Sequence, residues 1–287
     1  CTDNSLRVLD FIGCSDIPVY EGLSRPLVRL DFPTPKRIER DSPQDMHGTA
    51  LPLPAATSVQ QKAGAVEFLV ETLRATTTPI TLVPVGPLSN IAAALAIAPG
   101  IVSAVDEVVI MGGGHHVGNE TAAAEFNVWA DPEAADMVFA AGFERLTLVP
   151  LDATHKALVS AADCAAMAEL GTPAGDAASR IIGRRVAAYA QGHGVAAADA
   201  APVHDALCIA YLVAPEVITT RDMHVRVETQ GVRTVGRTVM DTRTHDSEPP
   251  NARVAFDADA RRFVELMTST FGPQLDADTP TTRERGD

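Results

Sequence analysis

Three short apolar runs, each followed by a helical pattern, limit the possible folds of this chain more than any other feature. The runs are ITLVPV (80–85), EVVIMGG (107–113) and RLTLVPL (145–151). Continuous apolar runs of this length are typical of strands covered on both faces, as in a parallel sheet whose crossovers are helices. The pattern LSNIAAALAI (88–97) lies between the first two runs and fits such a crossover helix. We therefore expect an α/β protein with an open, mostly parallel, Rossmann-like sheet flanked by helices.

Further elements are expected on both sides of these runs. An amphipathic helix is predicted over 58–75, and another helix is already under way in the first residues of the chain. Asp131-Pro132 marks the start of a third helix, because proline suits a first helical turn. Three later segments alternate as half-exposed antiparallel strands do, and a final helix follows them. These segments are MHVRVET (223–229), RTVGRTVM (233–240) and ARVAFDA (252–258), followed by the helix ADARRFVELMTSTF (258–271).

No internal repeat and no long linker divides the sequence, so we expect a single domain over residues 1–275 and a disordered tail over 276–287. The 37 acidic residues outnumber the 23 basic residues, which gives a formal net charge of −14. A surface with this negative charge repels the phosphates of nucleic acids. The four cysteines lie far apart and favour a reduced, cytoplasmic setting. No apolar stretch reaches the roughly 18 residues of a membrane-spanning helix, so no membrane partner is expected.

A ligand is expected beside the segments that follow the predicted strands, because open α/β sheets bind ligands at the carboxyl ends of their strands. GPLSN (86–90) follows the first run, and MGGGHHVGN (111–119) follows the second. Three consecutive glycines permit a close approach between backbone and ligand. The spacing differs from the GxGxxG of dinucleotide-binding proteins, which argues against an oxidoreductase. Both segments also fit plain loops that lead into the next element.

Two more polar clusters are candidates for a site. Glu125 and Asn127 stand one residue apart in AEFNVWADPEAAD, and on an extended segment their side chains face the same way. Such a pair can bind the vicinal hydroxyls of a sugar, although a solvated edge explains it equally well. His204 and Asp205 open an otherwise apolar helix. The alternative there is an N-cap aspartate beside a surface histidine.

The motifs ITLVPVGPLSNIAAAL, VVIMGGGHHVGN, AAEFNVWADPEAADMVF, LDATHKAL and VHDALCIAYLVAP, in this order, resemble the inosine-uridine preferring nucleoside hydrolases. The resemblance runs from Asn4 to about Gly272. It implies hydrolysis of the N-glycosidic bond of a ribonucleoside to a free base and ribose, at a site organised by one Ca²⁺ ion. It also implies a homodimer or homotetramer, and it leaves the choice between purine and pyrimidine bases open.

The resemblance also implies a role for each matching residue. The Asp205 side chain and the backbone carbonyl of Val85 match calcium ligands, and carboxylate and carbonyl oxygens suit this hard cation. His204 matches a histidine that protonates the departing base. The implied substrate-binding residues are Met111 beneath the sugar, Asn119, Glu125 and Asn127 at its hydroxyls, and His47 on the base side.

The sequence departs from this family at its start. Nucleoside hydrolases begin with a strand that ends in a DxDxxxDD motif, which supplies further calcium ligands and the general base. The first matching segment here, NSLRVLDFIG, corresponds to the helix after that motif. We therefore expect that the first strand is missing, that this exact chain binds Ca²⁺ weakly and that its hydrolase activity is impaired. The alternative is a non-catalytic relative that binds nucleoside or ribose, or serves as an interaction module.

Overall fold

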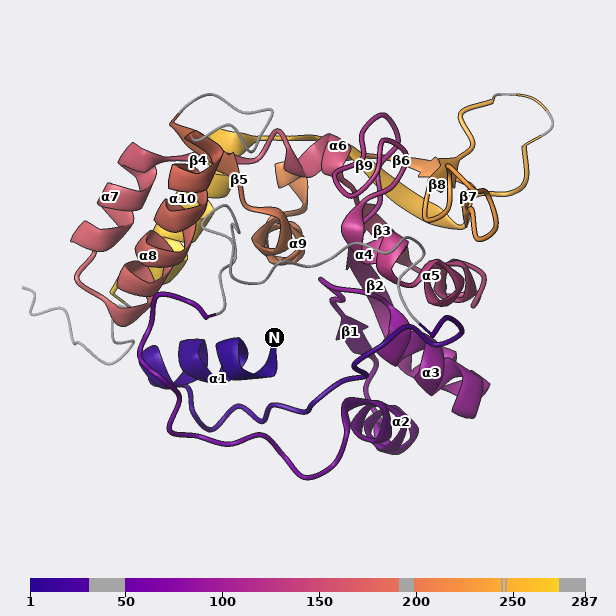
Figure 1. The fold of residues 1–287 in the computed structure, drawn as a ribbon, viewed down its shortest axis with the longest axis horizontal. Coiled ribbons are helices and arrows are strands. Elements are labelled where there is room, and N and C mark those ends of the chain that lie inside the picture. Colours follow the sequence, from indigo (N-terminus) through magenta and orange to yellow (C-terminus); the bar gives the residue numbers. More distant parts are fainter. Residues whose placement is uncertain (31–49, 191–198, 244, 246, 274–287) are drawn as a thin grey trace, which may run out of the picture.

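A five-stranded, mostly parallel sheet forms the centre of the molecule (Figure 1). The computed structural model describes residues 1–30, 50–190, 199–243, 245 and 247–273. The strand order is β1-β2-β3-β9-β6, in which neighbours among the first four are parallel and β6 is antiparallel to β9. The strands are β1 (Ile80–Leu82), β2 (Val105–Met111), β3 (Leu146–Val149), β6 (Ile218–Met223) and β9 (Ala252–Ala258). The predicted α/β fold with a mostly parallel sheet is confirmed.

Helices cover both faces of this sheet (Figure 1). One face packs against α2 (Ala65–Ala75), α3 (Ser89–Ile97) and α5 (Pro132–Phe139), and the short 3₁₀ helix η1 (Pro99–Ala104) joins α3 to β2. The other face packs against α7 (Ala161–Glu169), α8 (Pro173–Ala188), α9 (His204–Val213) and α10 (Ala260–Phe271). The first helix, α1 (Thr2–Phe11), contacts α8. None of the described helices is long and apolar enough to cross a membrane.

Short elements complete the fold near the ends of the central strands. The helices α4 (Phe126–Ala130) and α6 (Leu151–Thr154) follow β2 and β3, respectively, and the 3₁₀ helix η3 (Pro215–Val217) precedes β6. Two antiparallel pairs lie outside the main sheet. They are β4 (Leu158–Ser160) with β5 (Ala200–Pro202), and β7 (Val225–Val227) with β8 (Thr238–Met240).

Strand β2 explains why its sequence is a continuous apolar run. Val108 and Ile110 belong to the core beneath α2, α3 and α5, whereas Val109 and Met111 belong to the core beneath α7 to α10. All four side chains are at most 3% exposed. Because successive side chains of a strand point to opposite faces, a strand buried on both faces needs an apolar residue at every position.

The predicted helix over 58–75 begins later than expected, at Ala65. The N-cap residue Gly64 has an extended backbone, and the segment before it pairs with the loop near the start of the chain. The Gln61 amide donates to the Val19 carbonyl at 2.8 Å, and the Ala65 amide donates to the Glu21 carbonyl at 2.9 Å. These long-range backbone hydrogen bonds replace the first turns that the amphipathic pattern predicts. The helix start at Asp131-Pro132, in contrast, is confirmed.

The alternation over 252–258 predicts a half-exposed antiparallel strand, and this prediction is wrong in part. Strand β9 lies inside the sheet, parallel to β3 and antiparallel to β6, and Val254 and Ala255 are fully buried. The polar residue that makes the segment look half-exposed is Arg253. Its guanidinium donates to the buried carboxylate of Glu107 at 3.0 Å, so a polar side chain is accommodated in an interior strand. The other two tail segments form the end of β6 and the β7–β8 hairpin.

The β7–β8 hairpin touches α4 through a glycine, which leads to a stability prediction. Gly236 has a φ of +80°, and a Cβ atom there would lie 2.6 Å from the Trp129 Cα atom. Gly142 also has a φ of +80°, but a Cβ atom there would meet nothing within 4 Å. We expect Gly142→Ala to lower the free energy of unfolding by about 1 kcal/mol, from backbone strain alone. Gly236→Ala should lower it by about 3 kcal/mol, because overpacking adds to that strain.

Urea unfolding of the two variants measures this difference. Equal losses of stability in both variants would contradict the close approach between the hairpin and α4.

Candidate active site

The candidate site lies where β1, β2 and β3 end, which is where open α/β sheets bind ligands. Val85 follows β1, the glycines 112–114 follow β2, and α6 follows β3. The helix α9, which carries His204 and Asp205 in its first turn, packs against β2. Segments from four different parts of the chain therefore meet at this edge of the sheet.

The three glycines after β2 are required by the space around them. Gly113 has a φ of +71°, which is unfavourable for residues with a side chain. A Cβ atom on Gly114 would lie 1.9 Å from the Val117 carbonyl oxygen, and one on Gly112 would lie 3.3 Å from Glu125 Oε2. The glycines therefore let the backbone turn sharply and approach the Glu125 carboxyl group.

Glu125 is 3% exposed and forms the N-cap of α4. Its Oε2 accepts the Gly113 amide at 2.8 Å and the Val128 amide at 3.3 Å, and its Oε1 accepts the Asn127 amide at 2.9 Å. Burial raises the pKa of this carboxyl group to about 7, although the three amides act in the opposite direction. The negative charge of Asp205 raises the pKa further, so the carboxyl groups of Glu125 and Asp205 are close enough to interact.

Asn127 brings three predicted site groups together. Its Nδ2 donates to the Met111 carbonyl at 3.0 Å, to Met111 Sδ at 3.3 Å and to the Val85 carbonyl at 3.4 Å. The expectation that Glu125 and Asn127 lie on an extended segment is wrong, because α4 begins between them. Both side chains nevertheless face the end of β2, since the N-cap side chain turns back over the first helical turn.

Asn119 is exposed and supports the loop that leads to α4. Its Oδ1 accepts the Phe126 amide at 2.9 Å, and its own amide donates to the Ala124 carbonyl at 3.2 Å. The first hydrogen bond fixes the side chain by its carbonyl end, and the second fixes the Asn119 backbone. They leave the Nδ2 group as the part of Asn119 that can contact a sugar hydroxyl.

His204 and Asp205 occupy the first two positions of α9. The N-cap of this helix is Val203 and no side chain caps the helix, so the N-cap alternative for Asp205 is wrong. The His204 ring is anchored by Thr154, whose Oγ1 lies 2.6 Å from His204 Nδ1. The Asp205 carboxyl group keeps contact with solvent yet is crowded by protein atoms, and this desolvation raises its pKa, against the positive charge of Arg185.

The structure adds residues that the sequence analysis did not assign. The ring of His155 lies near that of His204, with 5.7 Å between the centroids and 50° between the ring planes, and burial lowers the pKa of His155. Asp152 and Thr154 come from the same run, LDATHKAL, and its position directly after a predicted strand was a usable signal. Arg185 lies in the last turn of α8 and acts on Asp205 and His155 only through the tertiary structure.

The predicted calcium ligands do not by themselves fit a calcium ion. The described residues include no group of three or more His, Cys, Asp or Glu side chains that could hold a metal. Asp205 and the Val85 carbonyl supply two kinds of oxygen, whereas Ca²⁺ takes six to eight oxygen ligands. His47, the remaining predicted substrate contact, lies outside the described residues.

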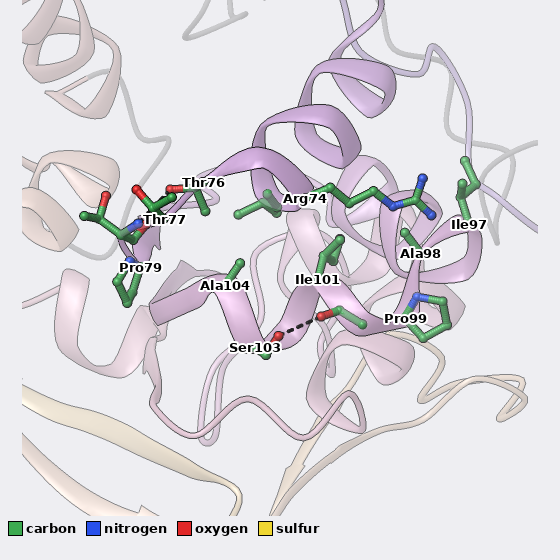
Figure 2. A pocket seen from close by; sticks show the side chains of 13 residues that line it. Arg74, Thr76, Thr77, Pro79, Ile97, Ala98, Pro99, Ile101, Ser103 and Ala104 are labelled. Atoms are coloured by element: carbon green, nitrogen blue, oxygen red, sulfur yellow. Dashed lines mark hydrogen bonds between the residues drawn. The ribbon is translucent and has the colours of Figure 1, made fainter.

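A groove of about 570 Å³ lies away from this site (Figure 2). It is formed by the end of α2, by the residues that precede β1, and by η1, which precedes β2. The groove therefore lies at the amino ends of β1 and β2. Arg74, Thr77 and Ile97 are among the residues that line it. It contains none of the predicted site residues and is not the candidate active site.

Known proteins resemble this chain over nearly its whole length. A family model described as inosine-uridine preferring nucleoside hydrolase matches residues 1–265. The pyrimidine-specific ribonucleoside hydrolase RihA of Shewanella woodyi is 37% identical over 270 residues, which are 94% of this chain and 84% of the relative. The pyrimidine-specific ribonucleoside hydrolase RihB of Shigella flexneri serotype 5b is 38% identical over 88% of this chain and 78% of the relative. A purine-preferring ribonucleoside hydrolase from Gardnerella vaginalis superposes with a TM-score of 0.82 at 28% identity, over 94% of this chain and 84% of that one.

The burial of Glu125 leads to a pH-dependent stability. Its pKa of about 7 in the folded protein lies above its ordinary value of 4.5, so the folded state holds this proton more tightly than the unfolded state. The resulting stabilisation is complete below pH 4.5 and is lost as the pH rises through 7. Relative to Glu125→Gln, which cannot ionise, the wild-type protein should lose about 2 kcal/mol of unfolding free energy between pH 5 and pH 8.

Urea unfolding of both proteins at the two pH values tests this. Because the glutamine side chain does not titrate, the hydrogen bonds that this variant loses are the same at both pH values and cancel from the comparison. A difference between the proteins that stays constant with pH would show that Glu125 titrates normally.

Proposed function

Because this chain belongs to the inosine-uridine preferring nucleoside hydrolase family, a family of N-ribohydrolases, we propose that it hydrolyses the N-glycosidic bond of ribonucleosides to a free base and ribose. One observation carries the proposal. Asn127, Met111 and the Val85 carbonyl meet at the ends of β1 and β2, beside the buried carboxyl group of Glu125. This arrangement offers amide and carboxyl groups to the hydroxyls of a sugar.

The ribose is bound by groups whose orientation is already set. Asn127 is anchored through Nδ2, so its Oδ1 is the atom that can accept a hydrogen bond from a hydroxyl. Glu125 contributes its carboxyl group, and Asn119 contributes its Nδ2 group. Because these side chains are held by backbone hydrogen bonds before the substrate arrives, binding requires little reorganisation.

Cleavage of the glycosidic bond leaves positive charge on the sugar ring, which acquires oxocarbenium character. The interacting carboxyl groups of Glu125 and Asp205 create a negative potential there. A cationic sugar favours the ionised form of Glu125, whose pKa of about 7 lies close to the ambient pH. This stabilisation exists only near the transition state and therefore accelerates the reaction.

The departing base needs a proton, and we assign its delivery to His204. The hydrogen bond between Thr154 Oγ1 and Nδ1 fixes the plane of the imidazole. A fixed ring presents Nε2 to the base in one direction, as general acid catalysis requires. The proton moves from His204 to a nitrogen of the base as the C1′–N bond breaks. A water molecule bonds to C1′ and releases its proton to solvent, from which His204 is protonated again.

Calcium, when bound in this family, supplies an anchor for sugar hydroxyls and for the attacking water. Asp205 and the Val85 carbonyl are the groups of this chain that would contact it. Since these two groups do not complete a calcium site, no step above depends on the ion. We propose that this chain binds Ca²⁺ weakly and hydrolyses nucleosides slowly. The homodimer or homotetramer implied by the family stays a prediction.

The weak calcium site gives a prediction that calorimetry can check. With one carboxylate among its ligands, the site should bind Ca²⁺ with a Kd no lower than about 1 mM. Asp205→Asn should abolish the remaining binding, because it removes that charge. A micromolar Kd for the wild-type protein would show that other residues complete the site.

We further propose that pyrimidine ribonucleosides are the preferred substrates. The support is that the two relatives at 37% and 38% identity are named pyrimidine-specific, whereas the purine-preferring structure is 28% identical. We expect kcat/KM for uridine to exceed that for inosine at least tenfold, a difference of about 1.4 kcal/mol in transition-state binding. Release of reducing sugar from each nucleoside measures it. A preference for inosine would overturn the proposed specificity.

The same assay separates the enzyme from a non-catalytic binding relative. Calorimetry with ribose and uridine is run in parallel, with His204→Ala as the matched variant. An enzyme should release ribose slowly and should lose kcat in the variant while retaining its ribose affinity. Binding of uridine without any release of ribose, even with Ca²⁺ added, would favour the binding module.

A further inference from the structure

We propose that Asp152 is a positioning residue for the reaction: it holds the glycine loop, residues 112–116, so that the Gly113 amide meets the Glu125 carboxyl group. The inference rests on the proposed function, because it gives the loop a role in binding ribose. Asp152 lies in the first turn of α6, directly after β3. It does not need to touch the substrate, since it acts through the backbone of the loop.

The Asp152 carboxylate accepts three hydrogen bonds from the outer end of the loop. Oδ2 accepts the His115 amide at 2.6 Å, and Oδ1 accepts the His116 amide at 3.0 Å and lies 2.8 Å from His116 Nδ1. The side chain is 7% exposed. Burial alone would raise the pKa of this carboxyl group, but the hydrogen bonds from His115 and His116 outweigh it and keep the pKa below its ordinary value. An ionised acceptor thus faces two consecutive amides and a ring.

The inner part of the loop is linked to Glu125 through the next amides. The Gly113 amide donates to Glu125 Oε2 at 2.8 Å, and the Gly114 amide donates to Thr238 Oγ1 at 3.0 Å. Thr238 also donates to the Gly114 carbonyl at 2.9 Å. The Leu151 amide donates to the Gly113 carbonyl at 3.0 Å. The peptide group between Gly113 and Gly114, which directly follows the amide that reaches Glu125, is therefore held between Thr238 on one side and Leu151 of α6 on the other.

The loop depends on such anchors because glycine has no side chain with which to pack. Each glycine loses more backbone freedom on ordering than other residues, at a cost of about 1 kcal/mol. The outer end carries only the rings of His115 and His116, which lie edge to face with centroids 4.3 Å apart, and His115 also touches Phe256. His116 is largely exposed. Without Asp152, water would compete for the two histidine amides, and the outer end of the loop would become more mobile. Gly113 would then be positioned by the Thr238 and Leu151 hydrogen bonds alone.

A more mobile glycine loop would change the hydrogen bonding of Glu125 more than it would change the stability of the fold. Glu125 would retain the Asn127 and Val128 amides, which belong to its own helix, whereas the Gly113 amide from the loop would be held less firmly. The carboxyl group would then be less firmly oriented toward the sugar. The expected signature is weaker binding of ribose together with a changed environment of the Gly113 amide.

The test compares Asp152→Asn with Asp10→Asn. Asp10 Oδ2 accepts the Thr57 amide at 2.6 Å, the Ser58 amide at 2.9 Å and the Thr57 hydroxyl at 2.9 Å. Its substitution therefore weakens hydrogen bonds of the same kind, from two consecutive amides and one side-chain donor, but Asp10 joins α1 to the segment before α2. The full chain is used for both variants, and thermal unfolding measures their stability.

Two readouts are taken: ribose and uridine binding by calorimetry, and the exchange rate and chemical shift of the Gly113 amide by NMR. Asp152→Asn should weaken ribose and uridine binding at least tenfold and accelerate exchange at Gly113, whereas Asp10→Asn should change neither by more than twofold. His116→Ala, which keeps both loop amides, should give a smaller loss of affinity than Asp152→Asn.

Equal binding by the two aspartate variants would overturn the inference, as would an unchanged Gly113 amide in a variant that binds poorly. The NMR readout requires neither turnover nor ligand. If the wild-type protein binds no nucleoside, the proposed function fails, and the Gly113 amide still decides whether Asp152 positions the loop.

Discussion

A buried carboxyl group that must be satisfied by backbone amides is the constraint around which this site is built. Glu125 is almost inaccessible to solvent, and an unpaired charge there would be costly. Two of its amides come from its own helix, but the third comes from Gly113, at the end of another element. The backbone around that amide is closely packed: a Cβ atom on Gly113 would lie 2.6 Å from Thr238 Cγ2, and one on Gly114 would lie 1.9 Å from the Val117 carbonyl oxygen, which explains these two glycines.

Distant segments hold this arrangement in place. Asp131 caps α5 through the Ala134 amide and also accepts the Ser89 hydroxyl at 2.5 Å and the Leu27 amide at 2.8 Å, so one carboxylate joins α3, α5 and the loop after α1. Thr238 reaches Gly114 across 124 residues of sequence. These hydrogen bonds join five regions of the chain, near residues 27, 89, 114, 131 and 238, and the precision of the site depends on their simultaneous formation.

The chemical character of the site follows from where its charges lie. Burial raises the pKa of Glu125, and the charge of Asp205 raises it further. Desolvation also raises the pKa of Asp205, although this residue stays exposed. In the proposed mechanism, the negative potential of these two carboxyl groups stabilises a cationic sugar. Arg185 acts on Asp205 in the opposite direction and limits the cost of holding the two carboxyl groups near each other.

Local patterns in the sequence determined the class of fold and indicated the family. The apolar runs predicted β1, β2 and β3 because strands buried on both faces need apolar residues throughout, and the motif order indicated the family. The tertiary structure alone decided where α2 begins, how β9 is paired and how Asp152 contributes. Each of these depends on a partner far along the chain: Val19 and Glu21 for α2, Glu107 for Arg253, and the loop amides for Asp152. A periodic pattern reports which face of an element is apolar, but it does not report which distant group satisfies a backbone amide or a buried charge.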